Sequence, residues 1–243
     1  MAGSQRSFES RKQRFTNANE GIQGKSDYDP NRDLIKKAIL TAFIASLNVK
    51  DAAVLVKIND YREKARLRRI NCFREKGCLD NCLENRIRNA YAYVCAEFGR
   101  DSSPARIIKA FLAMIAPVYV KKDPNSPDTK GKSPSEKSFG SLINKGKEIA
   151  AVLDDLGADY NPSDPDISAA SILALCELMD TYSKNIAKAE VAWSKAVSER
   201  KDLYDGPEGM TERIKIIKDY LASFPGGKKN QDYKDFCRLI AGR

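Results

Sequence analysis

Residues 135–162, SEKSFGSLINKGKEIAAVLDDLGADYNP, begin and end like residues 4–30, SQRSFESRKQRFTNANEGIQGKSDYDP. Both stretches open with Ser-x-(Arg/Lys)-Ser-Phe and close with Tyr-x-Pro. Between residues 142 and 156, large apolar side chains recur at the spacing of one face of an α-helix. The sequence therefore predicts a helical unit that occurs twice, once with an arginine-rich beginning and once with a leucine-rich beginning.

The duplication extends beyond these stretches. Residues 33–47 run parallel to residues 166–179, and a second set of matches lies 131 positions apart: Ala65, Arg69 and Phe73 with Ala196, Arg200 and Tyr204. Amphipathic helices with short connections are typical of up-and-down bundles. We therefore expect an all-α fold with two tandem, related helical bundles. The first spans residues 1–116, the second spans 135–243, and a Pro/Lys/Asp-rich linker at 117–134 joins them.

The second copy resembles an uncharacterised family of helical repeats from flavobacteria and their relatives. The residues that carry the resemblance are Ser138-Phe139, Tyr160-x-Pro162, the helix end from Ala196 through Arg200 to Tyr204, Gly209-Met210, Lys218-Asp219-Tyr220, Phe224 and Tyr233-Lys234. The resemblance covers residues 135–243 well and the first copy loosely. It implies tandem helical bundles, and it implies no activity because the family has no assigned function.

The charge of the chain is unevenly distributed along the sequence. The net charge is +9 over 243 residues. Residues 1–134 hold 26 Lys+Arg and 15 Asp+Glu, a net of +11, whereas residues 135–243 hold 16 and 18, a net of −2. A basic half of this kind favours an anionic partner.

The composition disfavours catalysis. The chain has no histidine, which removes the commonest general base and metal ligand, and it has no phosphate-binding loop or nucleophile motif. We expect no enzyme activity, no cofactor and no metal site. Cys72, Cys78, Cys82 and Cys95 lack paired C-x2-C spacing, so packing of reduced thiols competes with a zinc site and with a regulatory disulfide.

Two basic segments are candidate sites for an anion or nucleic acid. The tract 61–77, YREKARLRRINCFREKG, places arginines on one side of a helix, and the N-terminal segment carries few large apolar residues. The candidate residues are Arg6, Arg11, Lys12, Arg14, Arg62, Arg66, Arg68, Arg69 and Arg74. The alternatives are a solvated, acid-paired helix face for the tract and, for the N-terminal segment, either an arm that orders on a partner or a frayed terminus.

Two classes of function fit this sequence. In the first, a non-catalytic interaction protein binds RNA, a ribonucleoprotein or an acidic protein surface through its basic N-terminal half. In the second, a structural protein self-associates head to tail through its unlike-charged halves. The N-terminus has no hydrophobic signal segment and no uninterrupted apolar run is long enough to span a bilayer. We therefore expect a cytoplasmic protein that does not contact membranes.

Overall fold

A computed structural model describes residues 2–74, 77–115 and 138–242, which form helices and contain no strand. The all-α prediction is confirmed within these ranges. The predicted linker at 117–134 lies outside the described residues. The helices are α1 Ala2–Gln23, η1 Asp33–Ile35, α2 Lys37–Cys72, α3 Leu83–Phe98, α4 Ser103–Ile115, α5 Phe139–Asp154, η2 Gly157–Asp159, η3 Pro165–Ile167, α6 Ala169–Asp205, α7 Met210–Ala222, η4 Gly227–Lys229 and α8 Gln231–Ala241.

Two of these helices are longer than the apolar patterns suggest. Helix α2 connects the segment 33–47 with the basic tract 61–77 in one continuous helix. Helix α6 connects the segment 166–179 with the helix end at residues 196–204 in the same way. Neither helix contains a glycine or proline, the residues that most strongly interrupt a helix. Upstream of α6, the Asp164 side chain accepts a hydrogen bond from the Asp166 backbone N–H at 2.9 Å, with Pro165 in the first turn of η3. Asp is a favoured N-cap residue and proline is favoured in the first turn of a helix, so side-chain chemistry explains this start.

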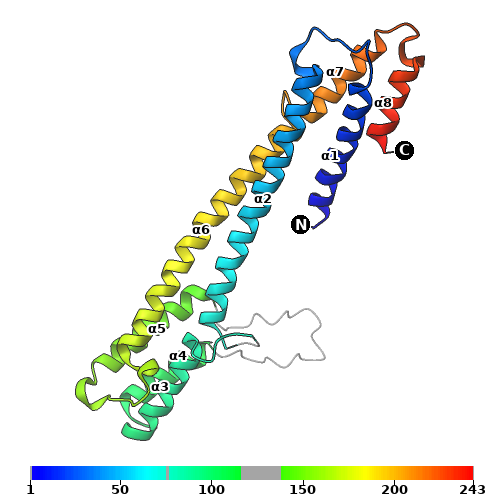
Figure 1. Cartoon of the computed structure of the whole chain (residues 1–243). Coiled ribbons are helices and arrows are strands. Elements are labelled where there is room, and N and C mark those ends of the chain that lie inside the picture. The colour runs from blue at the N-terminus through cyan, green and yellow to red at the C-terminus, as the bar shows by residue number, and fades with distance from the viewer. Residues whose placement is uncertain (1, 75–76, 116–137, 243) are drawn as a thin grey trace, which may run out of the picture. The chain divides into compact units, whose positions relative to one another are not determined.

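The chain forms two compact units. Unit 1 contains residues 1–60 and 189–243, and unit 2 contains residues 61–188. In unit 1, α1 lies beside α8, and α7 packs on both α8 and η1 (Figure 1). Its core includes Phe15, Ile22, Leu47, Tyr204 and Ile217.

Unit 2 repeats this arrangement with other helices. There α5 packs against α4, and α3 packs against α4, α5 and η3. Its core includes Leu83, Ile87, Val94, Leu142 and Cys176, all of which are fully buried. The two units thus correspond helix by helix: α1, α7 and α8 of unit 1 match α5, α3 and α4 of unit 2.

The same side-chain contact anchors the turn before each long helix. The Tyr28 O–H donates to the Ile35 carbonyl at 3.0 Å, and the Tyr160 O–H donates to the Ile167 carbonyl at 2.6 Å. Each bond spans seven residues, and the two lie 132 positions apart. Burial raises the pKa of both tyrosines, because the phenolate would lose its hydration. The repeated Tyr-x-Pro therefore marks a structural hydrogen bond that occurs once in each unit.

The aromatic partners of these tyrosines show how the copies combine. Tyr28 meets Tyr220 edge-on with ring centroids 5.2 Å apart, and Tyr160 meets Tyr93 edge-on at 5.3 Å. Tyr28 lies early in the first copy and Tyr220 lies late in the second. We call residues 1–60 and 135–188 the heads of the copies, and residues 61–116 and 189–243 their tails. Each unit thus contains the head of one copy and the tail of the other.

This exchange of halves differs from the sequential boundaries 1–116, 117–134 and 135–243. Helical periodicity predicts which face of a helix is buried, but it does not predict which copy supplies the covering helices. The alignment of residues 33–47 with residues 166–179 pairs Ile39 with Ile172 and Leu40 with Leu173, and the structure shifts this register by one residue. Leu40 and Ile172 are both fully buried, whereas Ile39 and Leu173 are 42% and 41% exposed. Equivalent positions along α2 and α6 are therefore 132 residues apart.

The exchange also redistributes the charge. Residues 1–60 with 189–243 hold 21 Lys+Arg and 16 Asp+Glu, a net of +5, and residues 61–188 hold 21 and 17, a net of +4. The contrast of +11 against −2 belongs to the linear sequence and is absent from the folded units. The positive charge that an anionic partner would meet is therefore set by local surfaces of each unit.

The N-terminal segment is a docked helix rather than the loosely held arm expected from its composition. Phe15, Ala18 and Ile22 of α1 are at most 1% exposed in the unit 1 core. Phe8 meets Tyr204 edge-on with ring centroids 4.7 Å apart. Although α1 has few large apolar residues, Phe15 and Ile22 are almost completely buried among the helices of unit 1, and this burial stabilises the helix.

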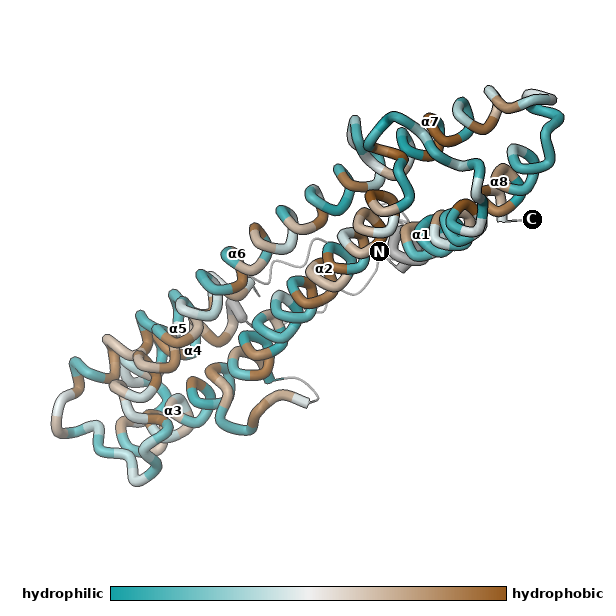
Figure 2. The backbone as a smooth tube through the Cα atoms, turned by 45° about the horizontal axis from the view of Figure 1, so that its top comes forward, coloured by the Kyte–Doolittle hydropathy of each residue, from teal (hydrophilic) through white to brown (hydrophobic). Residues whose placement is uncertain are grey.

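Helix α2 is unusually apolar for a helix with so much exposed surface. An 18-residue window in it is long and apolar enough to cross a membrane by length and composition alone, a test that core helices of soluble proteins also pass. Only 22% of that window is buried. Brown segments recur along α2 in the hydropathy colouring (Figure 2).

Candidate anion-binding surface

The second half of α2 presents a row of arginines. Arg62, Arg66 and Arg69 are all exposed, at the i, i+4, i+7 spacing that places them on one side of the helix. At the positions equivalent to Arg62 and Arg66, α6 carries Ser194 and Ser198, which are also exposed. The first copy therefore has two cations where the second copy has neutral hydroxyl groups.

Arg62 and Arg66 differ in whether they form an ion pair. Arg66 forms two hydrogen bonds with Glu63, at 2.7 and 2.8 Å, and holds the pKa of that carboxyl below its usual range. Arg62 forms no ion pair with another described residue. Such exposed pairs exchange readily with water and other anions because they contribute little stability. Arg62 and Arg66 thus remain open to a phosphate, and Arg62 is the less engaged of the two.

Arg68 belongs to the packing of unit 2 rather than to this exposed row. Its guanidinium carbon lies 3.8 Å from the centroid of the Phe139 ring, and it donates to Ser183 Oγ at 3.3 Å. Arg200 lies over Phe8 at 4.4 Å in the same way in unit 1. The structural equivalent of Arg200 is therefore Arg68, not the Arg69 matched in the sequence. Cation–π stacking accounts for both residues.

A polar pocket of about 350 Å³ lies between the end of α2 and α3. Arg74, Asn85, Arg88 and Asn89 supply donor groups to its lining, and Asp80 supplies a carboxylate. The turn that leads to α3 passes through Gly77, whose φ of +84° favours glycine. A phosphate or a single sugar-phosphate group fits in a pocket of this volume, whereas a larger ligand does not.

The charges around this pocket are partly neutralised. Arg88 pairs at 3.0 Å with Glu84, whose side chain is only 6% exposed, and Glu84 also accepts from the Arg74 backbone N–H at 3.0 Å. The Arg74 side chain forms no ion pair with another described residue. Since Asp80 opposes an incoming anion, the pocket alone is a weak site, and its donors contribute mainly as a continuation of the α2 row.

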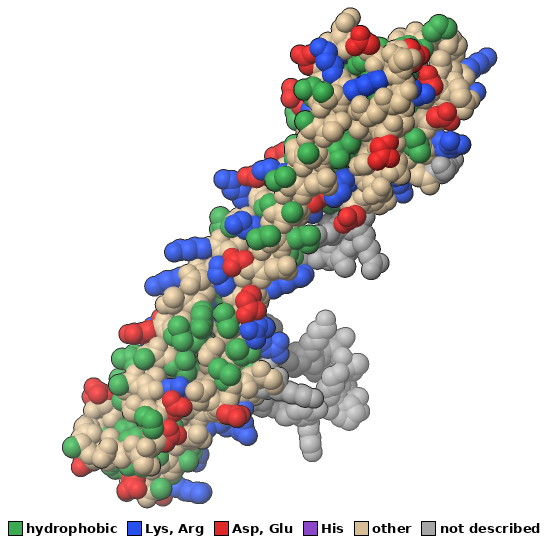
Figure 3. Space-filling model, in the orientation of Figure 1, with side chains coloured by type: hydrophobic (Ala, Val, Ile, Leu, Met, Phe, Trp, Pro, Cys, Tyr) green, Lys and Arg blue, Asp and Glu red, His purple; other side chains and the backbone are tan. Residues whose placement is uncertain are grey.

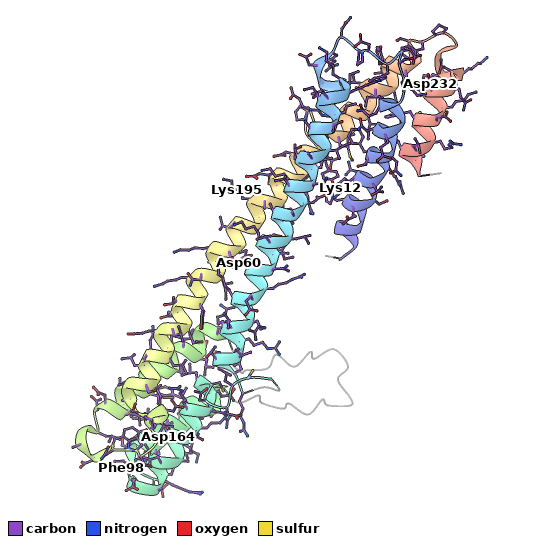
Figure 4. All side chains as sticks on the ribbon, in the orientation of Figure 1. Lys12, Asp60, Phe98, Asp164, Lys195 and Asp232 are labelled. Carbon is purple, nitrogen blue, oxygen red and sulfur yellow. The ribbon has the colours of Figure 1, made fainter. Side chains whose placement is uncertain are left out.

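The N-terminal cations are largely used inside unit 1. Arg11 pairs with Asp205 at 2.5 Å and donates to Thr211 at 3.0 Å, which lowers the pKa of Asp205. Lys12 pairs with Asp51 at 2.9 Å across α1 and α2 (Figure 4). These contacts dock α1, so neither residue is a free cation of a nucleic-acid-binding arm.

Arg14 lies beside an apolar pocket of unit 1. It is exposed, and with Arg11 it flanks an apolar pocket of about 160 Å³ formed by Met210, Ile214 and Ile240. The side chain of Arg6 lies outside the described residues. The candidate cations thus fall into different units: Arg11, Lys12 and Arg14 in unit 1, and Arg62, Arg66, Arg68, Arg69 and Arg74 in unit 2. On the face drawn in Figure 3, basic and acidic side chains are interspersed.

Sequence analysis did not select the donors on α3. Asn85, Arg88 and Asn89 lie at i, i+3, i+4, so they share one side of the helix beside Arg74. The spacing can be read from residues 84–89, ENRIRN. Arg86 lies between these donors in the sequence but on another side of the helix, so the three donors do not stand out as a group. Arg86 is structural: its Nε donates to the Asn81 carbonyl at 2.8 Å, as Arg213 Nε does to Glu208 at 3.0 Å in unit 1.

The cysteines divide by burial. Cys72, Cys82 and Cys176 are fully buried in unit 2, whereas Cys78 lines the polar pocket and Cys95 is partly exposed on α3. Among the described residues, no three His, Cys, Asp or Glu side chains are grouped as metal ligands. The buried thiols pack as small apolar groups.

We expect the buried cysteines to resist alkylation in the native protein. Burial raises the pKa of Cys72 and of Cys176 to about 12, so the reactive thiolate is scarce even at pH 9. Iodoacetamide labelling followed by peptide mass spectrometry should modify Cys78 and leave Cys72 and Cys176 unmodified until denaturant is added. Equal labelling of Cys72 and Cys78 without denaturant would contradict this packing.

Comparison with known proteins adds no assignment: no family model, curated protein or solved structure matches this chain. The resemblance to the flavobacterial repeat family therefore depends on the residues quoted above.

Proposed function

We propose that this protein is a non-catalytic interaction protein that binds an anionic partner, with RNA or a ribonucleoprotein favoured, through the exposed second half of α2. The observation that carries the proposal is the contrast between Arg62 and Arg66 in the first copy and Ser194 and Ser198 at the equivalent exposed positions of the second. Since the fold needs no cation at these positions, the arginines suit a role outside the fold. Guanidinium groups bind phosphate oxygens in a bidentate geometry.

We further infer that the scaffold is an internal duplication. Its support is the set of equivalent contacts in the two units, from the Tyr28 and Tyr160 hydrogen bonds to the stacked Arg68 and Arg200. A duplicated scaffold lets one copy keep the structural pattern while the other changes its surface. Arg74 and the α3 donors Arg88 and Asn89 extend the proposed surface beyond the end of α2.

The test replaces the two arginines with the residues of the other copy. We expect Arg62→Ser/Arg66→Ser to weaken binding to oligouridylate and to an unrelated RNA alike. The slope of log K against log salt should become shallower by about 1.4, because each phosphate contact to a single strand contributes about 0.7. Fluorescence anisotropy over a salt series measures this change.

The matched control is Lys195→Ser/Lys201→Ser on α6, which makes the same change in net charge at two other exposed positions. It should leave the salt slope near the wild-type value. The same loss of binding in both variants would show a dependence on net charge alone. That result, or no salt-dependent binding by the wild type, would reject the α2 surface as the site.

The alternative function, head-to-tail assembly through unlike-charged halves, has no structural observation in its favour. Its premise was the contrast between +11 and −2, and the folded units carry +5 and +4. Like-charged units offer no electrostatic attraction for that mode of assembly.

A further inference from the structure

The first half of α2 carries an exposed apolar stripe, formed by Ala42, Ala45, Val49, Ala52 and Val56. All five residues are exposed, and Val49 and Val56 are 67% and 63% exposed. They follow the alternating three- and four-residue spacing of a coiled-coil seam. The opposite side of the helix, with Leu40, Leu47 and Val54, is buried in unit 1. The stripe is thus a fixed, outward surface of unit 1.

The second copy provides an internal reference for this stripe. At the equivalent positions α6 carries Ala174, Glu177, Thr181, Lys184 and Lys188, which are all exposed. That face is polar, as is usual for a helix surface in contact with water. Four of the five positions therefore differ in polarity between two helices with the same buried pattern. The fold does not require the apolar residues on α2, so another surface accounts for them.

We infer that this stripe pairs with the same stripe of a second copy of the chain, in an antiparallel arrangement. The stripe has no charged residue, and Thr41, Asn48 and Leu55 along its side are exposed and uncharged; the exposed Lys57 and Asp60 at its C-terminal end carry opposite charges. Two identical surfaces of this kind meet without like-charge repulsion, even though the chain carries a net charge of +9. An anionic partner, in contrast, would find no cation on it.

The order of small and large residues supports the antiparallel pairing. In that geometry each valine lies opposite an alanine: Val49 opposite Ala52 of the second copy, and Val56 opposite Ala45. These four Val–Ala layers have the same total size, which allows two helices to keep a constant, close separation, and Ala42 lies opposite Asn59 at each end of the paired region. A parallel pair would instead alternate Val–Val and Ala–Ala layers and would leave gaps at the alanines.

The other apolar environment, a lipid bilayer, fits less well. Insertion of α2 would remove Leu40, Leu47 and Val54 from the unit 1 core. Interfacial binding usually requires a face rich in Lys and Arg, whereas Lys57 is the one exposed lysine between residues 37 and 60. The five residues span about 21 Å of helix. An interface of this length is at the small end of the range for stable complexes, so we expect a reversible, concentration-dependent dimer.

The experiment is sedimentation equilibrium of the full chain over a range of concentrations. We expect the wild type to shift from monomer to dimer and Val49→Glu to remain monomeric at every concentration. The control Thr181→Glu, at the equivalent exposed position of α6, should dimerise like the wild type. Because Val49 is exposed, the helical circular dichroism of Val49→Glu should be unchanged, which separates loss of pairing from loss of folding.

A charge-exchange rescue tests the register. Val49→Glu and Ala52→Lys should each be monomeric alone and should form a heterodimer when mixed, because these positions lie opposite each other in the antiparallel pair. A wild type that stays monomeric at its highest attainable concentration would overturn the inference. So would a dimer that Val49→Glu does not weaken, or a monomer that binds neutral vesicles through Val49. None of these results depends on RNA binding.

Discussion

Phe15→Ala should lower the free energy of unfolding of unit 1 by about 3–5 kcal/mol, the usual cost of removing a buried phenylalanine side chain. Phe15 is fully buried, and its ring meets that of Phe43 edge-on with centroids 6.1 Å apart. The cavity would open between α1 and α2, next to the Phe43 ring. Urea unfolding followed by the fluorescence of Trp193, the only tryptophan and a residue of unit 1, measures the effect.

This variant also distinguishes a docked N-terminal helix from a loose arm. Gln13→Ala, at an exposed position of the same helix, is the control and should change stability by less than about 0.5 kcal/mol. If Phe15→Ala were as neutral as Gln13→Ala, α1 would not be packed in solution. Arg11 and Lys12 would then be released from Asp205 and Asp51 and available to a partner.

Gly146→Ala should destabilise unit 2, although replacing glycine with alanine within a helix normally stabilises it by about 0.5–1 kcal/mol. A Cβ at residue 146 would lie 2.6 Å from Cys176 Sγ and 3.3 Å from Leu83 Cδ1. Overpacking of this kind costs about 1–3 kcal/mol, so the net loss should be about 1–2 kcal/mol. Urea unfolding followed by far-ultraviolet circular dichroism measures it.

A double-mutant cycle identifies the cause. In a Cys176→Ala background the sulfur is absent, so Gly146→Ala should lose most of its cost or become stabilising. Gly140→Ala on the same helix is the control, because a Cβ there meets no atom within 4 Å. If Gly146→Ala changed the free energy of unfolding equally with and without the Cys176 side chain, contact with that sulfur would not be the cause of the destabilisation.

The sequence predicted the local structure of this protein better than its tertiary arrangement. The all-α class, the helix faces and the cap at Asp164 follow from periodicity and side-chain chemistry, which are local. The exchange of halves depends on which helix pair packs on each head. Helices α7 and α8 pack on residues 1–60, and helices α3 and α4 pack on residues 138–188. The difference between the two possible partners lies in a few contacts, such as Tyr28 with Tyr220 rather than with Tyr93.

The candidate site was predicted in part for a related reason. The exposure of Arg62 and Arg66 follows from helical spacing, but the roles of Arg11, Lys12 and Arg68 depend on partners far away in the sequence: Asp205, Asp51 and Phe139. The separations are 194, 39 and 71 residues. No pattern of charge along the chain reports such pairs, and a count of cations therefore overestimated the free positive surface of the first half.

The exchange of halves also has an evolutionary consequence. If the internal duplication inferred above holds, a single copy could complete a unit only with the tail of a second molecule, so its smallest folded form would be a symmetric dimer. Joining two copies in one chain would make this association intramolecular and would allow equivalent positions to differ. Residues 62 and 66 of α2 and residues 194 and 198 of α6 differ in this way, which two identical chains could not achieve.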